Sequence, residues 1–390
     1  MANFLDYLAW RGDLTFAERS LNEVDNLIFS QLAYLEMKGA APGFGEGALP
    51  LSEVVRRCGA LGYQESDLVN NPWPLAERAA ACARYRDVRI SCYESEFDAQ
   101  RQIQFAAMTF SVADLVYVAF RGTDMSLVGW REDFNASYLE QTPGQRAAVR
   151  YLDRAADCFS GALRIGGHSK GGNLAVYAAA FCKPAVRERI AQVYSNDGPG
   201  MNRQVLCKPE IEAVWGKVRR YMPAASRVGI LLESRGERVL IRSSEQGAMQ
   251  HNPYTWLVEG TGFVRASAQS GDSLFMDETL RRWLEEVEEE QREDFVNALF
   301  DTLEATGAVR FPELGEKPWN AAGAILQAFG AMPADRQRSL MDTVKKLIGA
   351  GGSVIAEEAK SLLDQLPRPK IKKASAEAEG NGAPNEKQTR

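Results

Sequence analysis

Residues 167–172 read Gly-His-Ser-Lys-Gly-Gly, and this short segment restricts the fold more than any other part of the chain. An apolar run at 162–166 precedes it, and an alanine-rich segment with helical spacing follows at 173–182. A strand, a Gly-x-Ser-x-Gly turn and a helix make a nucleophile elbow, a sharp turn that raises the serine hydroxyl above a sheet. Bulky side chains two residues before or after Ser169 would collide with the strand and the helix, so both positions need glycine. The segment therefore predicts Ser169 as a nucleophile.

The chain around this turn alternates between predicted strands and predicted helices. Helical spacing indicates helices at 143–159 and 173–182. β-branched and aromatic runs bounded by turn residues indicate strands at 88–93, 102–110, 115–120, 162–166, 190–195, 218–221, 228–232 and 239–241. This alternation predicts an α/β fold, a layered sheet with helices on both faces.

Four regions are expected along the chain. They are an N-terminal helical, lid-like segment (1–87), an α/β core (88–272), a helical C-terminal region (273–366) and a disordered tail (367–390). The first contains a predicted helix over 14–37 and a Gly- and Pro-rich stretch at 38–75, which is a candidate lid over Ser169. In the third, helices begin near Asp277 and recur at about 319–331, 334–349 and 353–365. We expect that region to pack on the core or to dock a protein partner.

Composition excludes several classes of function. The charge balance of 46 − 52 = −6 gives no support for nucleic-acid binding, which usually needs a basic face. No run approaches the roughly 18–20 apolar residues that span a membrane, and the first residues show no secretion signal. The six cysteines are scattered, with no Cys-x-x-Cys pair, so neither a metal site nor a cofactor is predicted. We expect a cytoplasmic protein with free thiols.

A serine hydroxyl needs a base to act as a nucleophile at neutral pH, and the chain has only two histidines. His168 is adjacent to Ser169, and we expect its ring to point away from the hydroxyl and to pack. His251 lies in Gln-His-Asn-Pro-Tyr at 250–254, after the last predicted strand. His251 is therefore the predicted base.

The acid that supports this histidine should lie between the serine and the histidine in the chain. Asp197 follows the strand after the elbow helix, at the sheet edge where catalytic loops gather. The usual position is one strand later, at 223–226, where this chain has no carboxylate. Glu233 is the main alternative, followed by Glu237 and Glu245. An Asp-Gly turn residue without a catalytic role is the plainer interpretation of Asp197.

Acyl transfer also needs donors for a developing oxyanion. The backbone N–H of Lys170 is one candidate. Thr123 is the other, because it follows the predicted strand 115–120 in a turn that a glycine opens to close approach. Trp130 and Arg121, which flank this turn, are candidate substrate-binding residues.

These segments together carry a resemblance to a known family. Ala-Phe-Arg-Gly-Thr at 119–123 followed by Gly-His-Ser-x-Gly-Gly resembles the class 3 (fungal-type) lipases of the α/β-hydrolase fold. More closely, the chain resembles an uncharacterised bacterial family related to those lipases, through segments 104–110, 120–124, 129–134, 167–174, 195–200 and 250–253. The resemblance implies Ser169 as nucleophile, His251 as base, and Thr123 with Lys170 as oxyanion donors.

The chain departs from the lipase pattern at two places. Lys170 stands where such lipases carry an apolar residue, so we expect its cation either to favour an anionic substrate or to point into solvent. The lipase aspartate in an Asp-x-Val-Pro turn is missing, and Met-Pro-Ala-Ala-Ser stands there at 222–226. This gap leads to Asp197 as the acid.

Three hypotheses for function follow. The first is a serine hydrolase that cleaves a carboxylic ester or thioester of a small molecule or lipid through an acyl-enzyme on Ser169. The second is an amidase or peptidase with the same elbow. The third is a non-catalytic binding or scaffold protein that uses the C-terminal helices as its partner surface.

Overall fold

The structure is a computed structural model that describes residues 2–64, 71–310, 313–314, 318–339 and 341–346. Within these residues, eight strands form one sheet in the order of the chain: β1 (Ala48–Pro50), β2 (Arg89–Asp98), β3 (Ile103–Val112), β4 (Leu115–Phe120), β5 (Leu163–His168), β6 (Ile190–Asn196), β7 (Val218–Pro223) and β8 (Arg238–Ile241). A separate hairpin pairs β9 (Val258–Glu259) with β10 (Gly262–Phe263).

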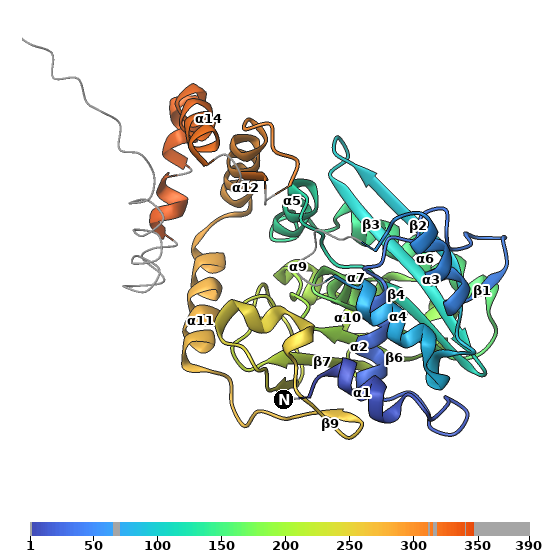
Figure 1. Cartoon of the computed structure of the whole chain (residues 1–390). Coiled ribbons are helices and arrows are strands. Elements are labelled where there is room, and N and C mark those ends of the chain that lie inside the picture. Colours follow the sequence, from blue (N-terminus) through green and yellow to red (C-terminus); the bar gives the residue numbers. More distant parts are fainter. Residues whose placement is uncertain (1, 65–70, 311–312, 315–317, 340, 347–390) are drawn as a thin grey trace, which may run out of the picture.

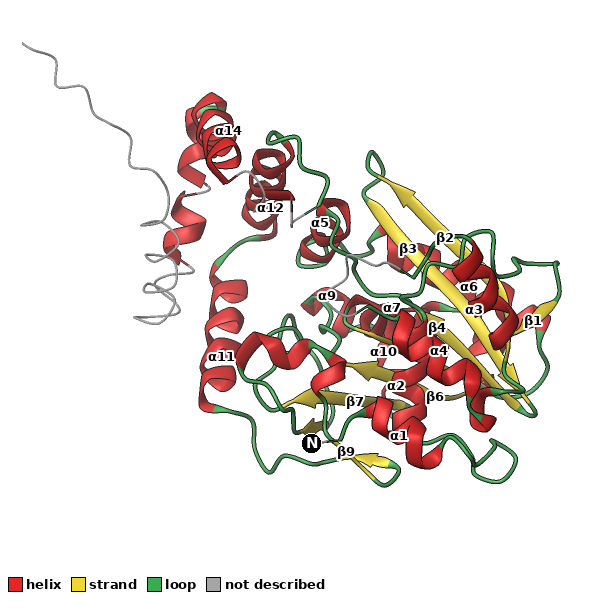
Figure 2. Ribbon diagram, in the orientation of Figure 1, coloured by secondary structure: helices red, strands yellow, loops and turns green. Residues whose placement is uncertain are grey.

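Helices surround the sheet on both faces (Figures 1 and 2). Four precede or flank the first strands: α1 (Phe4–Arg11), α2 (Glu23–Leu32), α3 (Leu51–Ala60) and α4 (Trp73–Ala81). Six lie between later strands: α5 (Leu127–Asn135), α6 (Pro143–Cys158), α7 (Lys170–Phe181), α8 (Pro184–Arg189), α9 (Arg203–Leu206) and α10 (Pro209–Trp215). The C-terminal region contains α11 (Gly271–Glu286), α12 (Glu289–Glu304) and α14 (Pro318–Ala331).

The direction of the strands places the functional loops. β1 to β4 pair antiparallel, and β4 to β8 pair parallel. Because the carboxyl ends of parallel strands meet at one edge, the loops after β4, β5, β6, β7 and β8 converge there. The predicted α/β-hydrolase-type sheet with helices on both faces is thus the observed fold.

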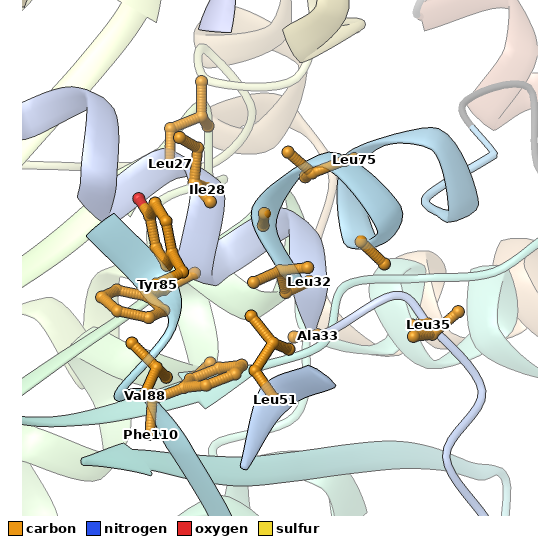
Figure 3. Close-up of a cluster of buried hydrophobic side chains, with 14 of the residues drawn as sticks. Leu27, Ile28, Leu32, Ala33, Leu35, Leu51, Leu75, Tyr85, Val88 and Phe110 are labelled. Carbon is orange, nitrogen blue, oxygen red and sulfur yellow. The ribbon is translucent and has the colours of Figure 1, made fainter. Parts of the chain in front are cut away.

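The alternation of side chains along β4 divides the core into two layers. Leu115, Tyr117 and Ala119 join the apolar cluster under α1 to α4, whereas Val116 and Val118 join the cluster under α6, α7 and α10. This period of two is what a strand buried on both faces produces. Figure 3 shows the first cluster, in which Leu27, Ile28 and Leu32 of α2 lie beside Tyr85, Val88 and Phe110. The N-terminal helices therefore cover one face of the sheet.

The predicted helix over 14–37 is wrong in its extent, because α2 begins only at Glu23. Asn22 is its N-cap and forms a capping box with Asp25. The Asp25 carboxylate is buried and accepts hydrogen bonds from Arg84 Nε at 2.7 Å and from Tyr85 Oη at 2.8 Å. Asn22 and Asp25 thus start the helix, and Asp25 also holds it to the segment after α4.

The predicted strand at 228–232 is also wrong, since these residues form an irregular loop between β7 and β8. Val228, Leu231 and Leu232 line a cavity instead of pairing in the sheet. A short apolar run suits either a buried strand or the wall of a cavity, so its composition alone does not distinguish the two.

The C-terminal helices pack on the core. α12 lies against α5, where Phe134 and Phe300 meet edge to face at 5.6 Å between ring centroids. Arg131 of α5 pairs with Asp301 at 3.0 Å and with Glu304 at 3.2 Å. α14 agrees with the expected helix near 319–331, whereas the helix near 353–365 and the tail 367–390 lie outside the described residues.

Candidate active site

Ser169 occupies a strained turn between β5 and α7. Its backbone has φ 57° and ψ −132°, a conformation that residues with a side chain rarely adopt. A Cβ on Gly171 would lie 2.2 Å from the carbonyl oxygen of Phe120, and one on Gly167 would lie 2.3 Å from the carbonyl carbon of Gly171. The glycines are therefore needed because backbone from β4, β5 and α7 meets here without space for side chains.

His251 and Asp197 are brought together at the carboxyl edge of the sheet. His251 ends a short 3₁₀ helix, η2 (Gly247–His251), and its Nδ1 lies 2.7 Å from Oδ2 of Asp197. Asp197 follows β6 and its side chain is fully buried. Because a carboxylate only accepts, Nδ1 carries the proton, and Nε2 of the neutral ring is then free to accept one. Glu233, the sequence-based alternative, instead pairs through its backbone with Met201.

His168 has a position that the sequence did not predict. Its ring is buried and stacks on the ring of His251, with 4.5 Å between centroids and an angle of 29°. Its Nε2 lies 3.0 Å from the carbonyl oxygen of His251 and must therefore donate, while Tyr34 Oη lies 3.2 Å from its Nδ1. His168 packs, as expected, but it packs on His251 and lines the same cavity. Burial, with a smaller contribution from His251, holds its pKa well below the usual value.

This lowered pKa gives a testable pH dependence of stability. The unfolded chain protonates His168 with an ordinary pKa near 6.5, whereas the folded chain keeps the ring neutral. Stability from this group is therefore present above about pH 6.5 and is lost as the pH falls. We expect the free energy of unfolding of the wild type, relative to His168→Gln, to fall by up to about 1.4 kcal/mol per pH unit on acidification.

Urea unfolding of both proteins between pH 5 and pH 7.5 measures this difference. Titrating groups that do not contact His168 cancel in the comparison, because both proteins contain them in the same surroundings. A gap that stays constant over this range would contradict a neutral, buried His168.

Thr123 and Lys170 both line the cavity that contains Ser169. The Thr123 hydroxyl donates a hydrogen bond to the carboxylate of Asp133. Burial raises the pKa of that carboxyl group to about 6. That hydroxyl is therefore already bound. Among the described residues, the backbone N–H groups of Thr123 and Lys170 make no hydrogen bond. Two such backbone N–H groups, at residues that line the same cavity as Ser169, are the kind of donor that an oxyanion requires.

The Lys170 side chain contradicts both expectations made for it. Its ammonium group is buried and donates to the backbone oxygen of Gln104 at 2.8 Å and to Oε1 of the same residue at 2.7 Å. Glu132 of α5, also buried, lies 3.1 Å away. The cation therefore faces neither solvent nor substrate and instead joins the start of α7 to α5 and β3. A lysine head group on a flexible stem reaches partners that local sequence does not reveal.

The two candidate substrate-binding residues have different positions. Trp130 of α5 lines the cavity. Arg121 is not among the residues that line this cavity, and its guanidinium lies 3.5 Å from the Glu36 carboxylate, so its role in substrate binding stays a prediction. Asp133, also in α5, accepts the hydrogen bond from the Thr123 hydroxyl.

The cavity above Ser169 has a volume of about 420 Å³ and a largely apolar wall. Part of that wall comes from the C-terminal helices, through Leu280, Trp283 and Leu284 of α11 and Val296 of α12. Described residues of the stretch 38–75 do not line it, so the candidate lid is not observed there. The stripe of Leu280, Trp283 and Leu284 is visible in the sequence, but it equally suits a helix that merely packs.

The charges that face the cavity are few. Of the described residues that line it, Lys170 alone carries an ammonium or guanidinium group, and that group is bound elsewhere. Asp124 and Asp133 are the lining carboxylates. In the part of the chain that the structure describes, no group of three or more His, Cys, Asp or Glu side chains could hold a metal ion. No described helix has the length and apolarity to cross a membrane.

The sheet and the loops at its carboxyl edge define an α/β-hydrolase fold. Within that class the chain belongs to the Mbeg1-like family, whose model matches residues 79–301. This family is lipase-like, so the resemblance to lipases is confirmed at the level of the family, whereas a bacterial source stays a prediction. The match includes α11 and most of α12, so it extends into the helical region that the lipase resemblance does not cover.

No curated protein matches the chain. Among solved structures, the chain is similar to the crystal structure of M37 lipase, with 15% identity, a TM-score of 0.33, and coverage of 52% of this chain and 68% of that one.

Proposed function

We propose that this protein is a serine hydrolase that cleaves an uncharged carboxylic ester or thioester through an acyl-enzyme on Ser169. One observation carries the proposal. His251, bonded to the buried carboxylate of Asp197, lines the cavity that contains Ser169, and Ser169 stands on a nucleophile elbow. A serine on such a turn, together with a histidine and a buried carboxylate, is the set of catalytic groups that acyl-transfer enzymes use. Membership in a lipase-like family supports the same class.

The reaction follows from the roles that these groups can fill. Nε2 of His251 takes the proton of Ser169 as Oγ attacks the carbonyl carbon of the substrate. The negative charge on the carbonyl oxygen is stabilised by the N–H group of Thr123, in the loop after β4, and by that of Lys170, at the N-terminus of α7. His251 then protonates the leaving alcohol or thiol, and water releases the acid in a second addition. Asp197 holds Nδ1 protonated and stabilises the imidazolium.

The lining of the cavity supports an apolar acyl group. Side chains of Leu231, Leu232, Leu280, Trp283, Leu284 and Val296 offer dispersion contacts and no charge. The described residues of the lining include two carboxylates and no free cation, so an anionic substrate would lose solvation there without gaining a partner. The expected substrate is therefore a neutral ester with an apolar acyl chain.

Labelling with a fluorophosphonate probe tests the proposal. Such a probe phosphonylates a serine only where a base activates it, so wild-type protein should be labelled and mass spectrometry should locate the adduct on Ser169. We expect His251→Ala to lower the labelling rate by several orders of magnitude. Ser160→Ala, a change at an exposed serine, should label as the wild type does.

Two outcomes of the experiment would redirect the assignment. A folded wild type that is not labelled would contradict an activated serine and would favour the binding or scaffold hypothesis. Labelling with turnover of anilides but not of p-nitrophenyl esters would place the protein among amidases.

A further inference from the structure

The carboxylate of Asp197 has a second partner besides His251. Ser226, in the turn after β7, donates its hydroxyl proton to Oδ1 of Asp197 at 2.6 Å, while Oδ2 faces His251. Both Ser226 and the Asp197 side chain are fully buried. A buried carboxylate is expensive unless its oxygens are hydrogen-bonded. Ser226 therefore satisfies an oxygen that the histidine leaves unbound.

The direction of the Ser226 hydroxyl is fixed by its own acceptor role. The backbone N–H of Gly229 donates to Ser226 Oγ at 2.8 Å. A hydroxyl carries one proton, so when Oγ accepts from Gly229 its proton is left for Asp197. A Cβ on Gly229 would lie 2.4 Å from Oδ1 of Asp197, so the loop closes over the carboxylate where no side chain fits.

The turn that carries Ser226 is itself fixed by the first residues of α11. Ser273 is buried and its hydroxyl donates to the carbonyl oxygen of Ser226 at 2.8 Å. Ser270, the N-cap of α11, donates its backbone N–H to Ala224 at 2.7 Å. The helix that supplies part of the cavity wall is thus bonded, at its N-terminus, to the turn that holds the acid.

We propose that Ser226 is a positioning residue that fixes the Asp197 carboxylate, so that His251 keeps the orientation needed to accept the Ser169 proton. This inference rests on the proposed function. With one donor on each oxygen, the plane of the carboxylate is set, and so is the ring that bonds to it. The turn at 222–226, which has no acid in this chain, supplies a hydroxyl toward an acid from the preceding strand.

Steady-state kinetics on Ser226→Ala tests this role. We expect kcat to fall about 10- to 100-fold, as for the loss of a hydrogen bond to a charged group. KM should stay within about twofold, because Ser226 does not line the cavity. Ser226→Thr keeps the hydroxyl and should restore most of kcat. A role in folding alone would leave kcat of the folded fraction unchanged in all variants.

The matched control is Ser91→Ala, which removes a buried hydroxyl from β2, outside the cavity. It should leave kcat at the wild-type value. If Ser226→Ala does not fold, Ser226→Cys offers a weak donor of similar size, and its kcat should lie between those of the wild type and Asp197→Asn. Wild-type kcat in folded Ser226→Ala or Ser226→Cys would overturn the inference. An inactive wild type would instead refute the proposed function, so the two failures are distinguishable.

Discussion

Ser169→Ala is expected to abolish ester hydrolysis while the protein stays folded. The change removes the atom that would form the acyl-enzyme, and loss of a triad serine typically lowers kcat by about 10⁴- to 10⁶-fold. Stability should change little, because no hydrogen bond of the Ser169 hydroxyl is found within the described residues. The strained backbone at φ 57° is as demanding for alanine as for serine.

Hydrolysis of a neutral p-nitrophenyl ester, with thermal unfolding alongside, measures both parts of this expectation. Ser160→Ala serves as the control for replacing a serine elsewhere on the surface. Full esterase activity in Ser169→Ala would contradict the proposed mechanism. A collapse of the melting temperature would instead assign the serine a structural role in the turn.

Residues that obey a local steric rule were predictable from the sequence. The turn around Ser169 follows from the close approach of β4, β5 and α7, which excludes side chains at Gly167 and Gly171. Strands β4 to β8 were found, within a few residues at their ends, because each combines an apolar run with turn residues at its boundaries. The candidate lid over 38–75 was predicted from loop composition alone, and loop composition imposes no such steric requirement.

His251 and Asp197 were predicted by a different argument. They are 54 positions apart, so no local pattern joins them. Only two histidines exist in the chain, and Asp197 lies where a parallel strand ends. Elimination and topology together were enough to place both residues at one sheet edge. The same topology placed Ser226 there too, but a serine without a known acid beside it carries no signal.

Features that depend on tertiary contacts were out of reach. The Lys170 ammonium group stands at the end of a flexible side chain, and its partner Glu132 comes from another helix. Apolar side chains of the run at Val228–Leu232 line the cavity, and the run does not pair in the sheet. The wall from α11 depends on how that helix docks, which its stripe of apolar residues does not specify.

Asp197→Asn is expected to lower kcat by about 10⁴-fold with little change in KM, since Asp197 does not line the cavity. The partners of this residue give the physical reason. His251 Nδ1 and Ser226 Oγ each donate to one carboxylate oxygen. An asparagine offers only one acceptor oxygen, and its amide donates on the other side. If the oxygen stays with Ser226, the NH₂ group faces Nδ1 and the proton moves to Nε2. That tautomer cannot accept a proton from Ser169.

Glu233→Gln is the matched control, because it makes the same chemical change in the sequence-based rival, which lies in the loop between β7 and β8. It should leave kcat within about twofold of the wild type, since the backbone of Glu233, and not its carboxylate, makes the contact with Met201. Measured kcat values near normal in Asp197→Asn, with a large loss in Glu233→Gln, would move the acid to Glu233. A large loss in Asp197→Asn that Asp197→Glu partly restores would indicate that the charge, and not only the shape of the side chain, keeps His251 in the competent tautomer.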